Sequence, residues 1–259
     1  MAHPQIAAFA RLAEGSAKAS RKIEGQKSSL GRTMHSIAYD EIHDEIVVPQ
    51  QLAQAILVFR GGATGEEPPI RIIQGPLTQL AAPDQLAIDP VHNEIFIPER
   101  EHVLVFSREA NGNVAPIRVL KGPDTLLGAD MAAVDPVRNL LVVSGRPPGP
   151  NGEPAGFSIF NRTDQGNVKP KWRIAGSNVG SGRVYVYPPK GELISAHGRA
   201  VGVWNIDDRG NVPPRWLIGG PGGELRSIRG IALDPKHKSV IVSDKQLNAV
   251  FTYYFPEIF

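Results

Sequence analysis

The sequence contains no cysteine, which excludes disulfide scaffolds, thiolate zinc sites and cysteine nucleophiles. It also contains no apolar run of about 18 residues, so no segment is expected to span a membrane. Neither sign of charge dominates, because 28 Lys and Arg face 26 Asp and Glu for a net charge of +2. This balance argues against a dedicated DNA-binding protein.

Glycine and proline, by contrast, are abundant. The 259 residues include 27 Gly and 23 Pro, and hydrophobic residues make up 41%. Such a chain has enough apolar residues for a core, but it turns too often for long helices or coiled coils. Its length suits one large domain or two small ones.

Two motifs alternate along the chain, which indicates a repeat protein. The first reads DQLAIDPVHNEIFI in its second copy, and the second reads HVLVFSREANGNVAPIRVLKG. Copies of the first lie at 35–48, 84–97, 130–143, 182–195 and 229–242. Copies of the second lie at 5–25, 55–75, 102–122, 156–176 and 200–220.

Each repeat holds four short apolar runs separated by turn signals, which we name strands A, B, C and D in chain order. Asp-Pro in the first motif and Gly-Asn in the second are turn formers, so A–B and C–D are expected to be hairpins. The recurring His43, His92 and His237 lie at the A–B turn, where a structural role is expected. Four antiparallel strands in each repeat of about 48 residues predict an all-β fold, a single β-propeller.

The number of blades depends on how the two ends of the chain are used. Strands A, B and D occur five times, whereas strand C occurs six times. We expect one domain over 1–259 with five four-stranded blades, in which residues 5–25 complete the C-terminal blade 229–255. The alternative is a six-bladed propeller with an incomplete blade. A helix at 4–20 competes locally with a strand at 5–10.

The last repeat resembles the NHL repeat. Segment 229–253 reads RGIALDPKHKSVIVSDKQLNAVFTY, and the C–D strands of the chain resemble those of bacterial NHL-like propellers, which read GN-x-x-P-x-R-x-I-x-G. The resemblance implies a propeller related to protein- and RNA-binding modules and, more distantly, to lactonases and lyases. It therefore implies fold more than function. The matching positions are Gly230, Ile231, Ala232, Leu233, Asp234, Asp244 and Asn248.

Function in a propeller is expected at one mouth of its central channel, where the A strands start and the B–C loops open. Polar residues that differ between blades at this mouth are the candidates for ligand binding, because sites are built where a repeated scaffold stops repeating. They are His35, Asp84, Asp130, Arg229, Glu99, Arg146, His197 and Asp244.

Three of these residues, His35, Asp84 and Asp130, form a candidate metal site. An imidazole with two carboxylates suits a divalent cation such as Ca, Zn or Mn, and Arg229 would then receive an anionic ligand. The opposing interpretation is that these charges pair because burial in a narrow channel demands it. The metal-binding Glu, Asn and Asp of lactonase propellers have no residue-by-residue match here, so no catalytic residue is assigned.

The sequence favours a non-enzymatic binding or scaffold module whose channel mouth holds a protein partner or a small-molecule ligand. The alternative is a divalent-metal-dependent, lactonase-like hydrolase or lyase with its site at the central channel. RNA is a disfavoured partner, because it would require basic residues and stacking aromatics on one face. If a signal peptide has been removed, we expect a periplasmic or secreted protein; otherwise we expect a cytoplasmic one.

Overall fold

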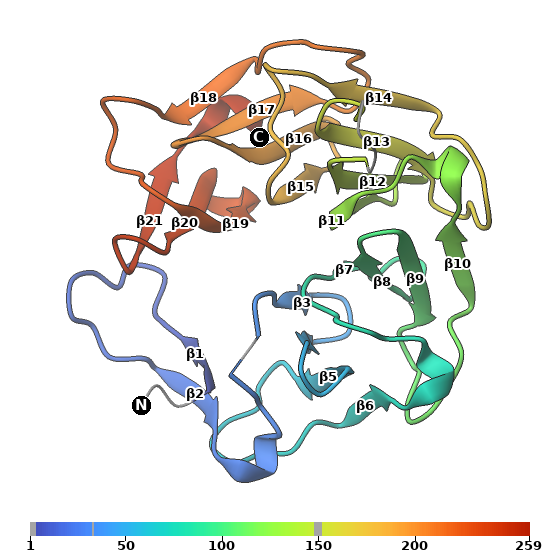
Figure 1. Ribbon diagram of the computed structural model, residues 1–259. Coiled ribbons are helices and arrows are strands. Elements are labelled where there is room, and N and C mark those ends of the chain that lie inside the picture. The colour runs from blue at the N-terminus through green and yellow to red at the C-terminus, as the bar shows by residue number, and fades with distance from the viewer. Residues whose placement is uncertain (1–3, 33, 148–151) are drawn as a thin grey trace. The chain divides into compact units, whose positions relative to one another are not determined.

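The computed structural model describes residues 4–32, 34–147 and 152–259. Within these ranges the regular structure consists of β-strands and short 3-10 turns, with no α-helix. The predicted fold class is confirmed: the protein is an all-β, five-bladed β-propeller (Figure 1). In the described ranges, no helix has the length and apolar character needed to cross a membrane.

The first two blades are four-stranded antiparallel sheets in which A, B, C and D are neighbours in chain order. The strands of the first blade are β3 (Ala38–Asp40), β4 (Glu45–Gln50), β5 (Ala55–Arg60) and β6 (Arg71–Gln74). Those of the second are β7 (Ala87–Asp89), β8 (Glu94–Glu99), β9 (His102–Ser107) and β10 (Arg118–Lys121).

The third and fourth blades repeat this order, and the sheet of the fifth contains three strands. The third blade contains β11 (Ala129–Asp135), β12 (Leu140–Gly145), β13 (Gly156–Asn161) and β14 (Trp172–Ala175). The fourth contains β15 (Val184–Tyr187), β16 (Glu192–His197), β17 (Ala200–Asn205) and β18 (Trp216–Gly219). The fifth contains β19 (Ile228–Asp234), β20 (Ser239–Asp244) and β21 (Ala249–Tyr254).

The chain forms two compact units. The first comprises Met1–Ile95 with Val105–Ile117, and the second comprises Phe96–Leu104 with Arg118–Phe259. Five 3-10 turns complete the regular structure of the described ranges: η1 (Gln26–Ser28), η2 (Pro76–Thr78), η3 (Pro123–Thr125), η4 (Pro235–His237) and η5 (Pro256–Ile258).

The N-terminal segment forms a hairpin of its own. Strand β1 (Gln5–Ala8) pairs antiparallel with β2 (Arg21–Glu24), and Ile6 lies opposite Ile23. The strand expected near the start of the chain is therefore confirmed, and the competing helix at 4–20 is not formed. That residues 5–25 complete the C-terminal blade stays a prediction.

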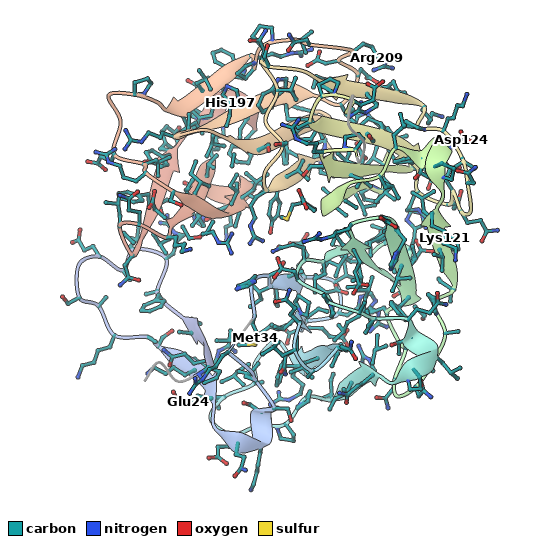
Figure 2. The ribbon with its side chains drawn as sticks, in the orientation of Figure 1. Glu24, Met34, Lys121, Asp124, His197 and Arg209 are labelled. Atoms are coloured by element: carbon teal, nitrogen blue, oxygen red, sulfur yellow. The ribbon has the colours of Figure 1, made fainter. Side chains whose placement is uncertain are left out.

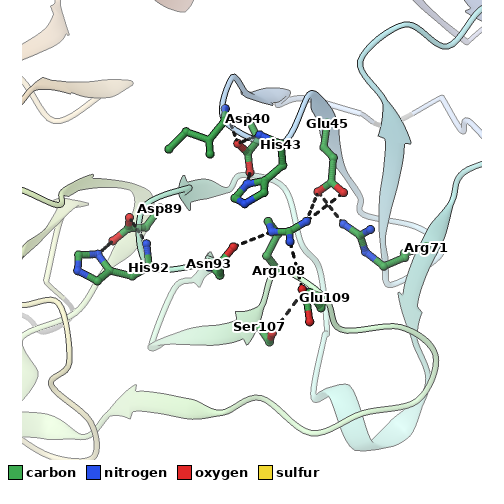
Figure 3. Close-up of polar contacts among 11 residues, drawn as sticks. Asp40, His43, Glu45, Arg71, Asp89, His92, Asn93, Ser107, Arg108 and Glu109 are labelled. Carbon is green, nitrogen blue, oxygen red and sulfur yellow. Dashed lines mark hydrogen bonds and ion pairs between the residues drawn. The ribbon is translucent and has the colours of Figure 1, made fainter.

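The recurring Asp and His residues build the A–B turns, as expected. In the first blade, Asp40 Oδ1 accepts hydrogen bonds from the backbone N–H of Ile42 and His43, while His43 Nδ1 lies 2.8 Å from Asp40 Oδ2. Asp89 and His92 repeat this contact at 2.8 Å (Figure 3). The aspartate thus satisfies turn N–H groups and fixes its own side chain through the imidazole, which explains the recurrence of the pair.

The Gly-Asn turn between strands C and D connects neighbouring blades within each unit. In the first unit, Asn113 Oδ1 accepts a hydrogen bond of 2.8 Å from the backbone N–H of Leu77. In the second unit, Asn167 Oδ1 accepts from the N–H of Asp124 at 2.8 Å, and its amide donates to the Asp124 carboxylate at 2.9 Å (Figure 2 labels Asp124). This dipeptide therefore shapes its own hairpin and also caps the turn that leaves the preceding blade.

Candidate functional site

The first unit brings two of the predicted site residues together. His35 lies three residues before β3 and Asp84 lies three residues before β7, so they are equivalent positions of adjacent repeats. His35 Nδ1 is hydrogen-bonded to Asp84 Oδ1. The side chains are 38% and 37% exposed, respectively. The start of the A strands in this unit therefore presents an accessible imidazole–carboxylate pair.

A buried amide supports this pair. Gln85 Nε2 donates a hydrogen bond of 2.8 Å to Asp84 Oδ2, and Gln85 is only 3% exposed. Sequence comparison missed Gln85, because the equivalent residues include the polar Ser36 and Arg183, so a polar side chain at this position does not stand out from the repeat.

In the second unit, two predicted residues occupy irregular places in their A strands. The register between β11 and β12 shifts between Ala129 and Met131, and the register between β19 and β20 shifts between Ile228 and Gly230. Asp130 and Arg229 are the extra residues at these shifts, and both are exposed. A β-bulge re-aims the side chain of its extra residue, and bulges are common beside functional sites.

Three further predicted residues of the second unit lie at the end of a B strand or directly after it. Glu99 Oε2 lies 3.3 Å from His102 Nε2, and the Glu99 side chain is only 6% exposed, so this carboxylate has a partner within its own blade. His197, labelled in Figure 2, packs edge-on against the ring of Trp204 with 5.7 Å between ring centroids. Arg146 is exposed directly after β12, and residues 148–151 of the long loop that follows lie outside the described residues.

Asp244 is deeply buried at the end of β20. It is 2% exposed, and its Oδ2 accepts hydrogen bonds from the backbone N–H of Arg226 and Ser227, at 2.6 and 2.8 Å. Its Oδ1 accepts from the N–H of Gln246 and Leu247, at 2.9 and 3.0 Å. The carboxylate therefore joins the loop before β19 to the turn after β20.

Asp244 should make the stability of the fold depend on pH. Burial alone raises the pKa of the Asp244 carboxyl, but the four backbone N–H groups favour the charged form and bring the pKa below its usual value. A group whose folded-state pKa is lowered stabilises the fold above the ordinary Asp pKa of about 3.9, and this contribution is lost as the pH falls through the folded-state value.

We therefore expect Asp244→Ala to lower the melting temperature at neutral pH, because four backbone N–H groups lose their acceptor. The difference in melting temperature between Asp244→Ala and the wild type should become smaller as the pH falls below about 4, because the wild-type carboxylate then becomes protonated. Thermal unfolding followed by circular dichroism across this range measures the effect. Asp207→Ala, at an exposed aspartate, is the matched control. A difference in melting temperature that stays constant with pH would contradict the conclusion that the charged form of Asp244 stabilises the fold.

The described residues contain no group of three His, Asp or Glu side chains that could hold a metal ion. In the first unit, His35 and Asp84 contact each other, whereas Asp130 belongs to the second unit. A divalent-cation site at His35, Asp84 and Asp130 stays a prediction.

Comparison with known proteins identifies the fold. No family model matches the chain, and no curated protein matches it in sequence. Among solved structures, the chain is similar to hydrazine synthase of Kuenenia stuttgartiensis, with 14% sequence identity and a TM-score of 0.57. The similarity covers 81% of this chain and 55% of that one, so this chain spans about half the length of the structure that it matches. At this identity the similarity shows the propeller fold alone.

Proposed function

We propose that this protein is an NHL-like binding or scaffold module without enzymatic activity, which recognises a protein or small-molecule ligand through blade-specific side chains at the start of its A strands. One observation carries the proposal. Asp130 and Arg229 both occupy register shifts in otherwise regular strands, and both side chains are exposed. Bulges that present polar side chains are a feature of binding surfaces rather than of a repeat that serves only packing.

The first unit supports the same function by a different chemistry. His35 and Asp84 form an exposed hydrogen-bonded pair, and the buried amide of Gln85 donates a hydrogen bond to Asp84. An amide is neither an acid nor a base at ordinary pH, so it positions the pair without adding a proton-transfer group. The pair can therefore donate and accept hydrogen bonds to a polar ligand.

A divalent-metal-dependent hydrolase or lyase is the rival function. The contact between His35 and Asp84 favours it, because imidazole and carboxylate are both ligands of zinc and manganese. The two functions require different ligands. The hydrolase or lyase would bind a divalent metal ion, whereas the binding module would bind an organic ligand.

Ligand-observed and protein-observed NMR can separate the two. The full chain is titrated with ZnCl₂, MnCl₂ and CaCl₂, and separately with a set of amino acids, dipeptides and monosaccharides. We expect organic fragments to shift resonances around His35 and Asp84, and we expect His35→Ala to lose this response. His92→Ala, which alters an A–B turn, is the matched control and should keep it.

Two results would overturn the proposal. The first is the absence of any response of the wild-type protein to the organic fragments. The second is stoichiometric zinc or manganese binding that His35→Ala abolishes, together with metal-dependent hydrolysis of a simple lactone, which would establish the rival.

A further inference from the structure

The junction between the first and second blades contains a carboxylate between two guanidinium groups. Glu45, the first residue of β4, accepts a hydrogen bond from Arg71 at the start of β6. It also lies 3.1 Å from Arg108, which follows β9 in the next blade (Figure 3). The same three positions recur at later junctions of the chain, where other residues occupy them.

The junction between the third and fourth blades has apolar residues at all three positions. Leu140 begins β12, Trp172 begins β14 and Ile206 follows β17. Trp172 Nε1–H donates to the carbonyl of Ile206 at 3.0 Å. The guanidinium carbon of Arg209, a residue labelled in Figure 2, lies 3.7 Å from the centroid of the Trp172 ring. This junction therefore lacks the glutamate as well as its two arginines, and its tryptophan stacks with a guanidinium group.

The junction between the fourth and fifth blades keeps the glutamate without the two arginines. Glu192 begins β16, Trp216 begins β18 in the place of the first arginine, and Phe255 follows β21 in the place of the second. The backbone N–H of Phe255 donates to the carbonyl of Lys238 at 2.9 Å, and the residue that it replaces makes the equivalent bond in the second blade. The Trp216 and Phe255 rings meet edge to face with 6.1 Å between centroids. All these residues belong to the second unit.

Strand pairing places Trp216 on the same face of the sheet as Glu192. Trp216 pairs with Val203, and Val203 pairs with Ile194, which lies two residues after Glu192. Side chains two residues apart in a strand point to the same face of the sheet. The first blade has the same register, and there the equivalent arginine contacts the carboxylate.

The Glu192 carboxylate keeps one oxygen without a partner. Its Oε2 is buried and, among the described residues, accepts no hydrogen bond. Burial raises the pKa of Glu192, which Arg215 and Lys190 lower and Asp208 raises. Both cations are engaged elsewhere: Arg215 Nη2 donates to Asp208 Oδ1 at 2.7 Å, and Lys190 Nζ donates to the carbonyl of Phe259 at 2.8 Å. Buried polar atoms in native folds are usually satisfied, so this oxygen points to a missing donor.

We propose that Glu192, Trp216 and Phe255 bind the guanidinium group of a ligand that is not part of this chain. A planar guanidinium can pair with a carboxylate through its N–H groups while its face stacks on an aromatic ring. The chain's own arginines do each of these separately, since two contact the equivalent glutamate in the first blade and one stacks on the equivalent tryptophan in the third. Trp216 is 44% exposed, so its ring can meet a ligand from solvent.

Fluorine NMR of the full chain labelled with fluorotryptophan tests the proposal, because the sequence contains only three tryptophans. The resonance of Trp216 is assigned by its loss in Trp216→Phe. The labelled protein is then titrated with the blocked tripeptide acetyl-Gly-Arg-Gly-amide and, separately, with agmatine. We expect the Trp216 resonance to shift saturably, whereas that of Trp204, which is 0% exposed, should stay in place. The same peptide with citrulline, a neutral isostere of arginine, should bind at least about tenfold more weakly.

Variants of the protein locate the site. Glu192→Gln removes the charge but keeps the shape of the side chain, so it should weaken binding about tenfold or more. Glu224→Gln, at an exposed carboxylate of the same unit, is the matched control and should leave binding unchanged. Glu192→Gln removes an unpaired charge rather than a partner, so circular dichroism should show a wild-type fold.

The two ligands also distinguish the source of the guanidinium group. Binding of the peptide that is at least about tenfold tighter than that of agmatine would identify a polypeptide as the source. Equal binding of both would identify a small molecule. Either result supports the site, because both ligands carry the same group.

The proposal fails on any of three results: no shift of the Trp216 resonance with either ligand at concentrations up to about 10 mM, equal binding of the arginine and citrulline peptides, or binding that Glu192→Gln does not weaken. The N-terminal segment of the chain is the other occupant to test, because Arg11 aligns with Arg108 in the second motif. If the ligands shift the resonance only in Arg11→Ala, this segment supplies the guanidinium and an external ligand is excluded.

Discussion

Replacing Glu45 with alanine should lower the free energy of unfolding by about 3–5 kcal/mol, because it removes the anion that pairs with the partly buried Arg71 and leaves the partly buried Arg108 only the exposed carboxylate of Glu109. Glu45 begins β4 and is 6% exposed. Its Oε2 accepts a hydrogen bond from Arg71 Nη2 at 2.6 Å, and both of its oxygens lie 3.1 Å from Arg108 Nη1 (Figure 3). Urea unfolding followed by circular dichroism measures the loss.

The cost is large because the arginines have little access to water. The Arg71 and Arg108 side chains are only 18% and 14% exposed. Arg108 is further held by Asn93, whose Oδ1 accepts from its Nε at 2.8 Å, so the guanidinium cannot easily turn toward solvent. Loss of the carboxylate therefore leaves charge buried, rather than simply removing an attraction.

An exposed ion pair in the same blade provides the control. Glu67 pairs with Arg60 at 2.7 Å, but the Arg60 side chain is 58% exposed, so Glu67→Ala should cost less than about 1 kcal/mol. Glu45→Gln keeps one oxygen acceptor, so its loss of free energy of unfolding should lie between those of Glu45→Ala and Glu67→Ala. If Glu45→Ala proved no more costly than Glu67→Ala, the network would not stabilise the first unit.

The blades were predictable because each one is determined by local pattern. The Asp40 and Asp89 turns, the Gly-Asn hairpins and the aromatic residue of each C strand recur in the sequence, and each acts mainly within its own repeat or on its neighbour. The Glu45–Arg108 contact was not predictable in this way. Its residues are 63 positions apart, and nothing in the repeat pattern says that an arginine after strand C should reach the B strand of the preceding blade.

The candidate site also contains both features that the repeat pattern predicts and features that it does not. His35 and Asp84 meet because equivalent positions of adjacent repeats lie close together in this unit, which alignment can predict. The bulges at Asp130 and Arg229 escaped prediction because the repeats align there without an inserted residue, so the shift exists only in the pairing with the B strand. Two of the four hydrogen bonds of Asp244 depend on the backbone path of a preceding loop, which residue types do not reveal.

The second large effect concerns Trp204, which is 0% exposed in the core between the third and fourth blades. Trp204→Ala should cost about 3–5 kcal/mol, since it removes the largest buried side chain of this core and leaves a cavity. The ring meets Phe157 edge to face with 5.6 Å between centroids, and its Nε1–H donates to the carbonyl of Val212 at 3.1 Å. Trp204→Ala would leave that carbonyl without its donor.

A glycine two residues earlier makes room for this ring. The C strands of the first three blades place phenylalanine at the position of Trp204, and at the position of Gly202 they carry leucine or serine. A Cβ on Gly202 would lie 2.5 Å from Trp204 Cη2, closer than real Cβ contacts allow. The fourth blade has therefore exchanged a side chain at one position for a larger ring at the other, within one packed volume.

A double-mutant cycle tests this exchange. Gly202→Ala alone should cost about 1–3 kcal/mol, because the added methyl group displaces the indole. In a Trp204→Phe background the same substitution should cost much less, since the smaller ring leaves room and the pair then approaches that of the other blades. The free energies come from urea unfolding of the four proteins. Equal costs of Gly202→Ala in both backgrounds would show that the glycine serves the backbone rather than the ring.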